Sequence, residues 1–117
     1  MLDAARDLVL GSSCVGCGRP GRVLCTSCRA GLEVVPGPAW PTPVPPGLTD
    51  PWAATAYDGT VRAMVVGHKE HRLLALARPL GDLLAAAVGA ALADLVPEPA
   101  PLVLVPVPSR PATVRAR

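Results

Sequence analysis

The sequence predicts a two-part fold, in which a small cysteine-bearing module precedes a partial α/β segment with a Rossmann-like parallel sheet. All four cysteines fall within residues 14–28, and seven of the fifteen prolines fall within 36–51. Beyond them, short apolar runs alternate with a long apolar helical pattern. A chain of 117 residues suits one ordinary domain or two small ones. We therefore expect a module over residues 1–35, a Pro-rich linker over 36–51 and an α/β domain over 52–117, which the family resemblance described below implies to be incomplete.

The four cysteines form two Cys-x2-Cys pairs separated by seven residues, at Cys14, Cys17, Cys25 and Cys28. Structural zinc takes four tetrahedral ligands, and all-cysteine sites commonly supply them from two such pairs. Gly18, Pro20 and Gly21 allow the intervening chain to reverse direction, so that the second pair can meet the first. No histidine or carboxylate lies between the pairs. We therefore predict a closed, structural zinc site in a small zinc ribbon or knuckle.

The charges around the cysteines fit this prediction. Four thiolates and Zn²⁺ carry a formal charge of about −2, which three flanking arginines could offset: Arg19, Arg22 and Arg29.

Three alternatives use the same four cysteines, namely two disulfides, a redox-active pair and an iron site. Residues 1–10 carry Asp3, Arg6 and Asp7 and lack a continuous apolar stretch, so no secretory signal is predicted. We expect a cytoplasmic protein with reduced thiols, and this setting favours zinc over disulfides.

The composition limits the remaining function classes. The net charge is only +2 and aromatic residues make up 3% of the chain, so there is no strong nucleic-acid signal. The most apolar stretch, 73–96, is interrupted by Arg78, Pro79 and Asp82. Its longest uncharged run, 83–93, is shorter than the roughly 20 residues that cross a bilayer. We therefore predict a buried helix of a soluble protein and no membrane span.

The N-terminal half has few regular elements. Residues 1–10 place apolar side chains at helical spacing and predict a short helix that packs on the module. Residues 29–35 predict a last helical turn or a strand, ended by Pro36. The prolines of 36–51 fix φ and remove amide donors, so this linker is expected to be an extended, semi-rigid spacer. Trp40 is expected to pin the linker to a neighbouring domain, and a ligand for a proline-binding domain is the alternative.

The next segment predicts a strand followed by a helix. Residues 52–57 form a short apolar run after a proline and predict a strand. Asp58 and the glycine after it turn the chain, and Asp58 can cap a helix that begins near Thr60. Gly67 is expected to weaken the end of this helix. The positions predicted to form its buried face are Val61, Met64, Val65 and His68.

A polar cluster follows, with His68 and His71 on either side of Lys69 and a glutamate. Two histidines three positions apart could share a metal ion. No third ligand lies close in the sequence, and a solvated helix end is the alternative that we favour.

Residues 73–95 carry the strongest helical pattern. Pro79 predicts a helix start or a kink, because proline is tolerated in the first turn. Residues 102–105 predict a strand buried on both faces, as in a parallel sheet joined by a right-handed crossover. Ligands of such sheets bind beyond the carboxyl ends of the strands, which corresponds here to 106–110. The apolar stripe of the helix consists of Leu83, Leu84, Ala87, Val88, Ala91, Leu92 and Leu95.

The order of these motifs resembles a known family. The motifs are Cys-x2-Cys-Gly with Leu-Cys-x2-Cys, the Pro-rich linker, Tyr57-Asp58-Gly59-x-Val61-Arg62-Ala63-x-Val65, Lys69, Leu76-Ala77-x-Pro79-Leu80 and Val105-Pro106-Val107-Pro108-Ser109. The chain is similar over nearly its whole length to the N-terminal part of the ComF family. Members join a zinc-ribbon module to a type I phosphoribosyltransferase domain and are associated with DNA uptake in competent bacteria. The resemblance implies a phosphoribosyltransferase-like fold.

The resemblance also implies what this chain lacks. The family's diagnostic strand carries paired acidic residues before a Thr-Gly-rich loop that binds the ribose 5-phosphate of phosphoribosyl pyrophosphate. No such stretch occurs here, so we predict no catalytic residue and expect a truncated chain that is inactive alone. A full-length relative would bind phosphoribosyl pyrophosphate with Mg²⁺. The residues that correspond to its substrate-binding positions are Ser109, Arg110, Arg115, Arg117 and Lys69, and solvated side chains are the alternative.

A second function stays open at this point. The zinc module could itself be the working part, which docks a protein of the competence machinery or single-stranded nucleic acid during DNA uptake. The small net charge and the scarcity of aromatic residues disfavour nucleic acid. A strand at 102–105 without neighbours would also present an apolar edge, and such an edge favours self-association.

Overall fold

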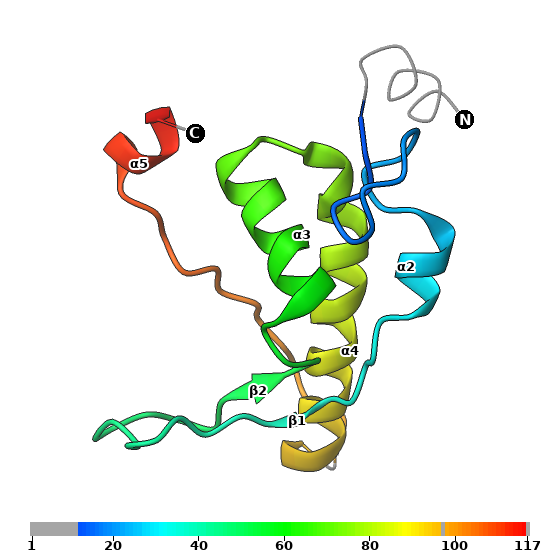
Figure 1. Cartoon of the computed structure of the whole chain (residues 1–117). Helices are drawn as coiled ribbons and strands as arrows, with labels where there is room; N and C mark the ends of the chain where they lie inside the picture. The colour runs from blue at the N-terminus through cyan, green and yellow to red at the C-terminus, as the bar shows by residue number, and fades with distance from the viewer. Residues whose placement is uncertain (1–11, 97, 117) are drawn as a thin grey trace.

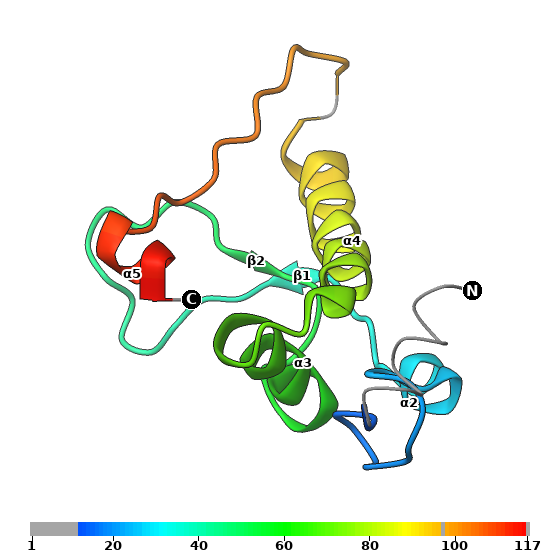
Figure 2. The same ribbon diagram turned by 90° about the horizontal axis from the view of Figure 1, so that it is seen from above.

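The computed structural model describes residues 12–96 and 98–116. Two helices, α3 and α4, lie side by side, and the cysteine-bearing loop and α2 pack next to them, while a pair of short strands crosses the far part of α4 (Figures 1 and 2). The predicted helix at 1–10 lies outside the described residues. The elements are α2 (Thr26–Ala30), β1 (Gly37–Pro38), β2 (Trp52–Ala53), α3 (Gly59–Glu70), the 3-10 turn η1 (Leu74–Leu76), α4 (Ala77–Leu95) and α5 (Pro111–Ala116).

The Pro-rich segment is a long loop whose two ends are joined. β1 and β2 pair antiparallel, with Gly37 opposite Ala53 and Pro38 opposite Trp52. Two further backbone hydrogen bonds extend the pairing on either side, from Val35 to residue 54 and from residue 39 to residue 51. Figure 1 shows the segment between the strands as an arm that leaves the body and returns. The expectation of an extended, semi-rigid spacer between two domains is therefore corrected, because the two ends of the segment hydrogen-bond to each other.

Trp40 lies in this arm and is 47% exposed. The structure therefore does not support the predicted role of Trp40 in pinning the linker to a neighbouring domain. The arm itself, residues 40–50, is exposed throughout. Its shape follows from the prolines, which limit φ and remove backbone donors.

Helix α3 begins where the sequence predicts. Asp58 occupies the position before the first turn with extended backbone, as an N-cap residue does, but its side chain makes no capping hydrogen bond. Gly59 follows with a φ of +44°, a conformation that glycine adopts without strain. Met64 is fully buried on the face that the periodicity indicates.

Gly67 has a different role from the one predicted. The helix continues beyond it to Glu70, and Gly67 is buried. A Cβ atom at this position would lie 3.1 Å from the Cδ1 atoms of both Leu73 and Leu76, and 3.5 Å from Cγ1 of Val15. The glycine thus allows three side chains to approach the helix backbone, and it does not mark the end of the helix.

Helix α4 confirms the expected helical pattern only in part. Pro79 lies in its first turn, where a missing amide hydrogen costs nothing. Leu83 and Ala87 are buried, as the stripe predicts. Leu84 and Leu95 are 64% and 48% exposed, so the buried face is narrower than the apolar stripe.

One helical stretch, residues 74–95, is long and apolar enough by composition to cross a membrane, with a mean hydropathy of 1.4. This finding is weak evidence for a span, because the core helix of a soluble protein passes the same test. The helix packs on β1, β2 and α3 within the described residues. The cytoplasmic location stays a prediction.

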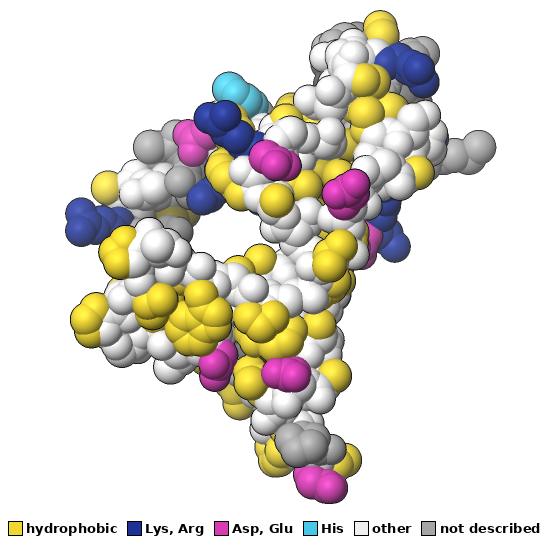
Figure 3. Space-filling view, turned by 60° about the horizontal axis from the view of Figure 1, so that its bottom comes forward, with side chains coloured by type: hydrophobic (Ala, Val, Ile, Leu, Met, Phe, Trp, Pro, Cys, Tyr) yellow, Lys and Arg dark blue, Asp and Glu magenta, His cyan; other side chains and the backbone are white. Residues whose placement is uncertain are grey.

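A single small hydrophobic cluster holds these elements together. Its buried members are Val23, Ala54, Met64, Leu76, Leu83 and Ala87. The partly buried residues packed against it are Val15, Leu24, Leu32, Val61, Leu73 and Leu80. The cysteine loop and the helical segment therefore contribute to the same core. Large apolar side chains also remain exposed, and Figure 3 shows many of them on one face.

The predicted parallel sheet is not present in the described residues. Residues 102–105 form no strand, and the two strands that occur are antiparallel. The physical reason is that a strand requires a neighbour to satisfy its backbone groups, and no other described segment lies in register beside 102–105. Residues 111–116 instead form the short helix α5, which begins at a proline, a favoured first helical residue.

Candidate metal centre

Short-range backbone hydrogen bonds fold the first Cys-x2-Cys pair into a tight loop. The amide of Gly18 donates to the carbonyl of Cys14 at 2.8 Å, and the amide of Cys14 donates to the carbonyl of Arg19 at 2.9 Å. Gly18 has a φ of +74°, so the turn requires a residue that tolerates the left-handed conformation. An isolated antiparallel bridge between Ser13 and Pro20 closes the loop.

The second pair lies at the start of helix α2. Cys25 is the N-cap residue, and its Sγ accepts a hydrogen bond from the amide of Cys28 at 3.4 Å. The amide of Cys25 in turn donates to Sγ of Cys14 at 3.3 Å. One cysteine thus links the two pairs, because its amide binds one sulfur and its own sulfur receives the next amide.

The four sulfur atoms form a compact cluster. All Sγ atoms lie within 4.8 Å of one another, and those of Cys17 and Cys25 are 3.7 Å apart. Four sulfurs at about 2.3 Å from a tetrahedral zinc would be about 3.8 Å apart. Cys14 and Cys25 are buried, Cys28 is half-buried and Cys17 is exposed. The cluster therefore has the size and the donor atoms of a metal site, and all four cysteines are free thiols.

The pKa values of three of the thiols, Cys14, Cys25 and Cys28, are shifted in different directions. Burial raises the pKa of Cys14, but hydrogen bonds from backbone amides, chiefly that of Cys25, outweigh it and lower the pKa to about 6. A hydrogen bond from the amide of Cys28 lowers the pKa of Cys25. The Cys28 thiol hydrogen-bonds to the sulfur of Cys25 and is surrounded by other sulfurs, which raises its pKa to about 12. A cation bound by all four sulfurs would displace the proton of the Cys28 thiol.

The sulfur cluster packs against helix α3 through Val15 and Gly16, which lie between the first two cysteines. A Cβ atom on Gly16 would lie 2.9 Å from Sγ of Cys28 and 3.1 Å from Cγ2 of Thr60. Only a glycine fits between the sulfur cluster and the first turn of α3. Val15, its neighbour, packs against the hydrophobic core and approaches Gly67.

The flanking arginines are arranged less simply than predicted. Arg29 forms a 2.6 Å ion pair with Asp82, which joins α2 to α4. The positive charge of its guanidinium is therefore offset by a carboxylate and does not act on the sulfurs alone. Arg19 and Arg22 are exposed next to the cysteine loop.

The other predicted site residues are not gathered into a common site. Lys69 is exposed near the end of α3, while Ser109, Arg110 and Arg115 are exposed in the C-terminal segment. Arg117 lies outside the described residues. Of the described His, Cys, Asp and Glu residues, only the four cysteines form a group of three or more possible metal ligands, so no third described ligand joins His68 and His71.

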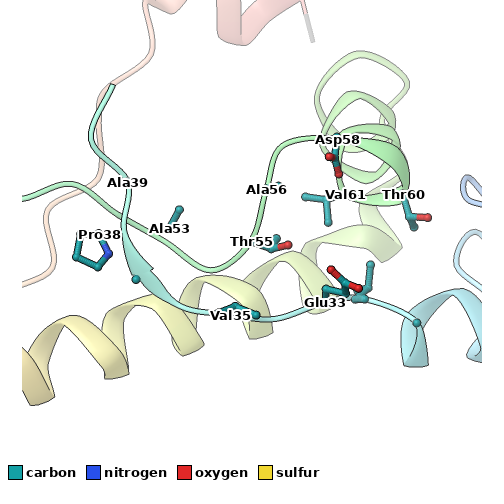
Figure 4. Close-up of a pocket in the computed structure, with 13 residues that line it drawn as sticks. Glu33, Val35, Pro38, Ala39, Ala53, Thr55, Ala56, Asp58, Thr60 and Val61 are labelled. Atoms are coloured by element: carbon teal, nitrogen blue, oxygen red, sulfur yellow. The ribbon is translucent and has the colours of Figure 1, made fainter. Parts of the chain in front are cut away.

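The structure also forms a cleft that the sequence does not reveal. It has a volume of about 600 Å³ and lies between the chain that follows α2 and the chain that precedes α3 (Figure 4). The Glu33 and Asp58 side chains come from opposite walls, and Val61 lies between them in the view, with Thr55 beside them. No single stretch carries these residues, and the β1–β2 pairing brings the two walls together. The predicted substrate-binding residues that the structure describes, Lys69, Ser109, Arg110 and Arg115, do not line this cleft.

Comparison with known proteins finds no match among family models, curated proteins or solved structures. The resemblance to the ComF family therefore stays a prediction that rests on the order of short motifs. The cysteine cluster is the one predicted site whose geometry the described residues support.

Proposed function

We propose that Cys14, Cys17, Cys25 and Cys28 bind one zinc ion in a closed, structural site. The observation that carries this proposal is the convergence of the four Sγ atoms within 4.8 Å. Zinc prefers four thiolates in a tetrahedron, and closed all-cysteine sites are usually structural.

The surroundings of the sulfurs support a structural role over a catalytic one. Catalytic zinc keeps one coordination position open for water or substrate, and four cysteine ligands leave none. Backbone amides donate to the sulfurs of Cys14 and Cys25, which fixes these sulfurs and stabilises their negative charge. The site therefore favours tight metal retention.

The metal would stabilise the fold by linking two segments of the chain. The buried core has six members, and helix α2 has five residues, too few to be stable alone. A hydrophobic core this small contributes little stability, and a bound metal ion can supply part of what is missing. Zinc would join the turn around Gly18 to α2, and Gly16 and Val15 would then hold both against α3.

Metal analysis of the full chain, purified without oxygen, tests this proposal. We expect one zinc per chain, and removal of the ion by a strong chelator should lower the Tm, followed by circular dichroism, by more than about 10 °C. Zinc content well below one per chain, together with four titratable thiols in a protein that is still folded, would overturn the proposal.

We also propose, on the resemblance alone, that the chain is a cytoplasmic ComF-like phosphoribosyltransferase-family protein that lacks activity by itself. The order of its motifs supports the family, and the absence of an acidic pair before a Thr-Gly-rich loop supports the inactivity. Titration calorimetry with phosphoribosyl pyrophosphate and Mg²⁺ should show no tight binding. Tight, magnesium-dependent binding to this chain would contradict the inactivity.

A further inference from the structure

The four cysteines of the sulfur cluster differ in how open they are to solvent. Cys17 is exposed, and it lies in a stretch that is exposed throughout, residues 16–20. Cys14 and Cys25 are buried, and the sulfur of each accepts a hydrogen bond from a backbone amide. A small oxidant dissolved in water therefore meets Cys17 first, because the oxidation of a cysteine depends on its exposure and thiolate character.

The sulfur of Cys17 also has a partner within short reach. Its Sγ atom lies 3.7 Å from Sγ of Cys25. A disulfide bond is about 2.0 Å long, so these two sulfurs need to approach each other by about 1.7 Å. Cys17 lies in an exposed turn, whereas Cys25 is the N-cap residue of α2. A small movement of the exposed turn is therefore enough to join the two sulfurs.

We propose that Cys17 and Cys25 form a redox switch of the zinc site, in which a peroxide converts the two sulfurs to a disulfide and the ion is released. The inference rests on the zinc site proposed above. In the first step the Cys17 thiolate attacks one oxygen of hydrogen peroxide, the O–O bond breaks, and a sulfenic acid and a hydroxide ion form. In the second step the Cys25 thiolate attacks the Cys17 sulfur, and the S–S bond forms as a second hydroxide leaves.

The electrons and atoms of these two steps balance. The two sulfurs together lose two electrons, and the peroxide gains them. The two hydroxide ions take up two protons and become water. Zinc has no redox chemistry of its own and stays Zn²⁺ throughout.

Oxidation of this pair would exchange one cross-link for another. A disulfide supplies no thiolate, so only Cys14 and Cys28 remain as ligands, and two ligands hold zinc far more weakly than four. The disulfide between Cys17 and Cys25 joins the first Cys-x2-Cys pair to the start of α2, as the ion would. A disulfide within either pair would also release zinc but would leave the two pairs unconnected. The switch thus predicts a zinc-free form whose loop stays closed, and reduction by a dithiol restores the thiolates.

Disulfide mapping of the full chain tests the pairing. Zinc-loaded protein is treated with stoichiometric hydrogen peroxide, and released zinc is followed with a chromogenic chelator. Trypsin cleaves after Arg22, which places the two Cys-x2-Cys pairs on separate peptides, 7–22 and 23–29. We expect zinc release with the two peptides joined, and fragmentation by mass spectrometry should assign the bond to Cys17 and Cys25.

The opposing outcomes are distinct from one another. Zinc release with a disulfide inside either peptide, or a treated chain that keeps its zinc and its four thiols, would overturn the switch and leave the zinc site standing. A chain that is purified without bound zinc would overturn the zinc site itself.

A matched pair of histidine variants tests which sulfur reacts first. Cys17→His and Cys28→His each leave three cysteines and one histidine, a ligand set that zinc also accepts. Cys17→His removes the exposed sulfur and should slow the release of zinc by peroxide at least about tenfold. Cys28→His keeps both sulfurs of the switch and should release zinc within about threefold of the wild-type rate. Equal rates for the two variants would contradict the role of Cys17. The zinc content of each variant is measured first, and the mapping of the wild-type chain decides the pairing if either variant fails to bind zinc.

Discussion

The cysteine loop and the C-terminal segment illustrate two ways in which a short irregular chain can be organised. Residues 12–28 have little regular structure, yet their amides bond to nearby carbonyls and sulfurs, and Cys14, Val23 and Cys25 are buried. Residues 98–110 are rich in valine and leucine but are exposed throughout. Apolar composition alone therefore does not produce burial in this protein. The cysteine loop is fixed by local hydrogen bonds, which cost little chain entropy to close, and its buried Val23 then packs against the core formed by α3, η1 and α4.

The largest expected effect follows from removing one sulfur. Cys14→Ser takes away the most buried thiol, so we expect loss of bound zinc and a fall in Tm of more than about 10 °C in thermal unfolding followed by circular dichroism. Ser27→Ala, an exposed change in α2, should shift the Tm by less than about 3 °C. Similar Tm values for the two variants would show that the sulfur cluster does not stabilise the fold.

The second prediction separates contact from composition within one short stretch. Leu76 is fully buried and Leu74 is 72% exposed, two positions apart. Leu76→Ala should lower the free energy of unfolding by about 2–5 kcal/mol, because it leaves a cavity in the core. Leu74→Ala should change it by less than about 0.5 kcal/mol. Urea unfolding of both variants measures the difference, and equal losses would contradict the packing described here.

The third prediction concerns two helical glycines with different surroundings. Gly81 has open space at its Cβ position, so Gly81→Ala should stabilise α4 by up to about 1 kcal/mol. Gly67→Ala gains the same helix propensity but places a methyl group 3.1 Å from two leucine carbons, in a core with little room to move. We expect a net loss of about 1 kcal/mol for Gly67→Ala. A stabilising Gly67→Ala would show that the packing of Leu73 and Leu76 against α3 is loose.

The smallest expected effect is at the ion pair between α2 and α4. Arg29 and Asp82 are 2.6 Å apart, but their side chains are 51% and 61% exposed. Such pairs contribute about 0–1 kcal/mol and are screened by salt. A double-mutant cycle of Arg29→Ala and Asp82→Ala should give a coupling energy in this range that falls at high salt. A larger, salt-independent coupling would mean that the ion pair contributes more than the sulfur cluster to holding α2 against α4.

The sequence determined the features that depend on neighbours along the chain. The spacing of the four cysteines predicts a cluster because two short turns suffice to bring the sulfurs together. The periodicity from Thr60 onward predicts α3, and Pro79 falls in the first turn of α4 because proline cannot lie deep inside a helix.

The tertiary structure decided what depends on contacts between distant residues. The ends of the Pro-rich segment pair with each other, Gly67 packs against Val15, and Glu33 and Asp58 face each other across a cleft. Residues 102–105 have the composition of a strand but form none within the described chain. Composition sets how well a segment suits burial or pairing, but hydrogen bonds and packing form only where another segment is brought alongside.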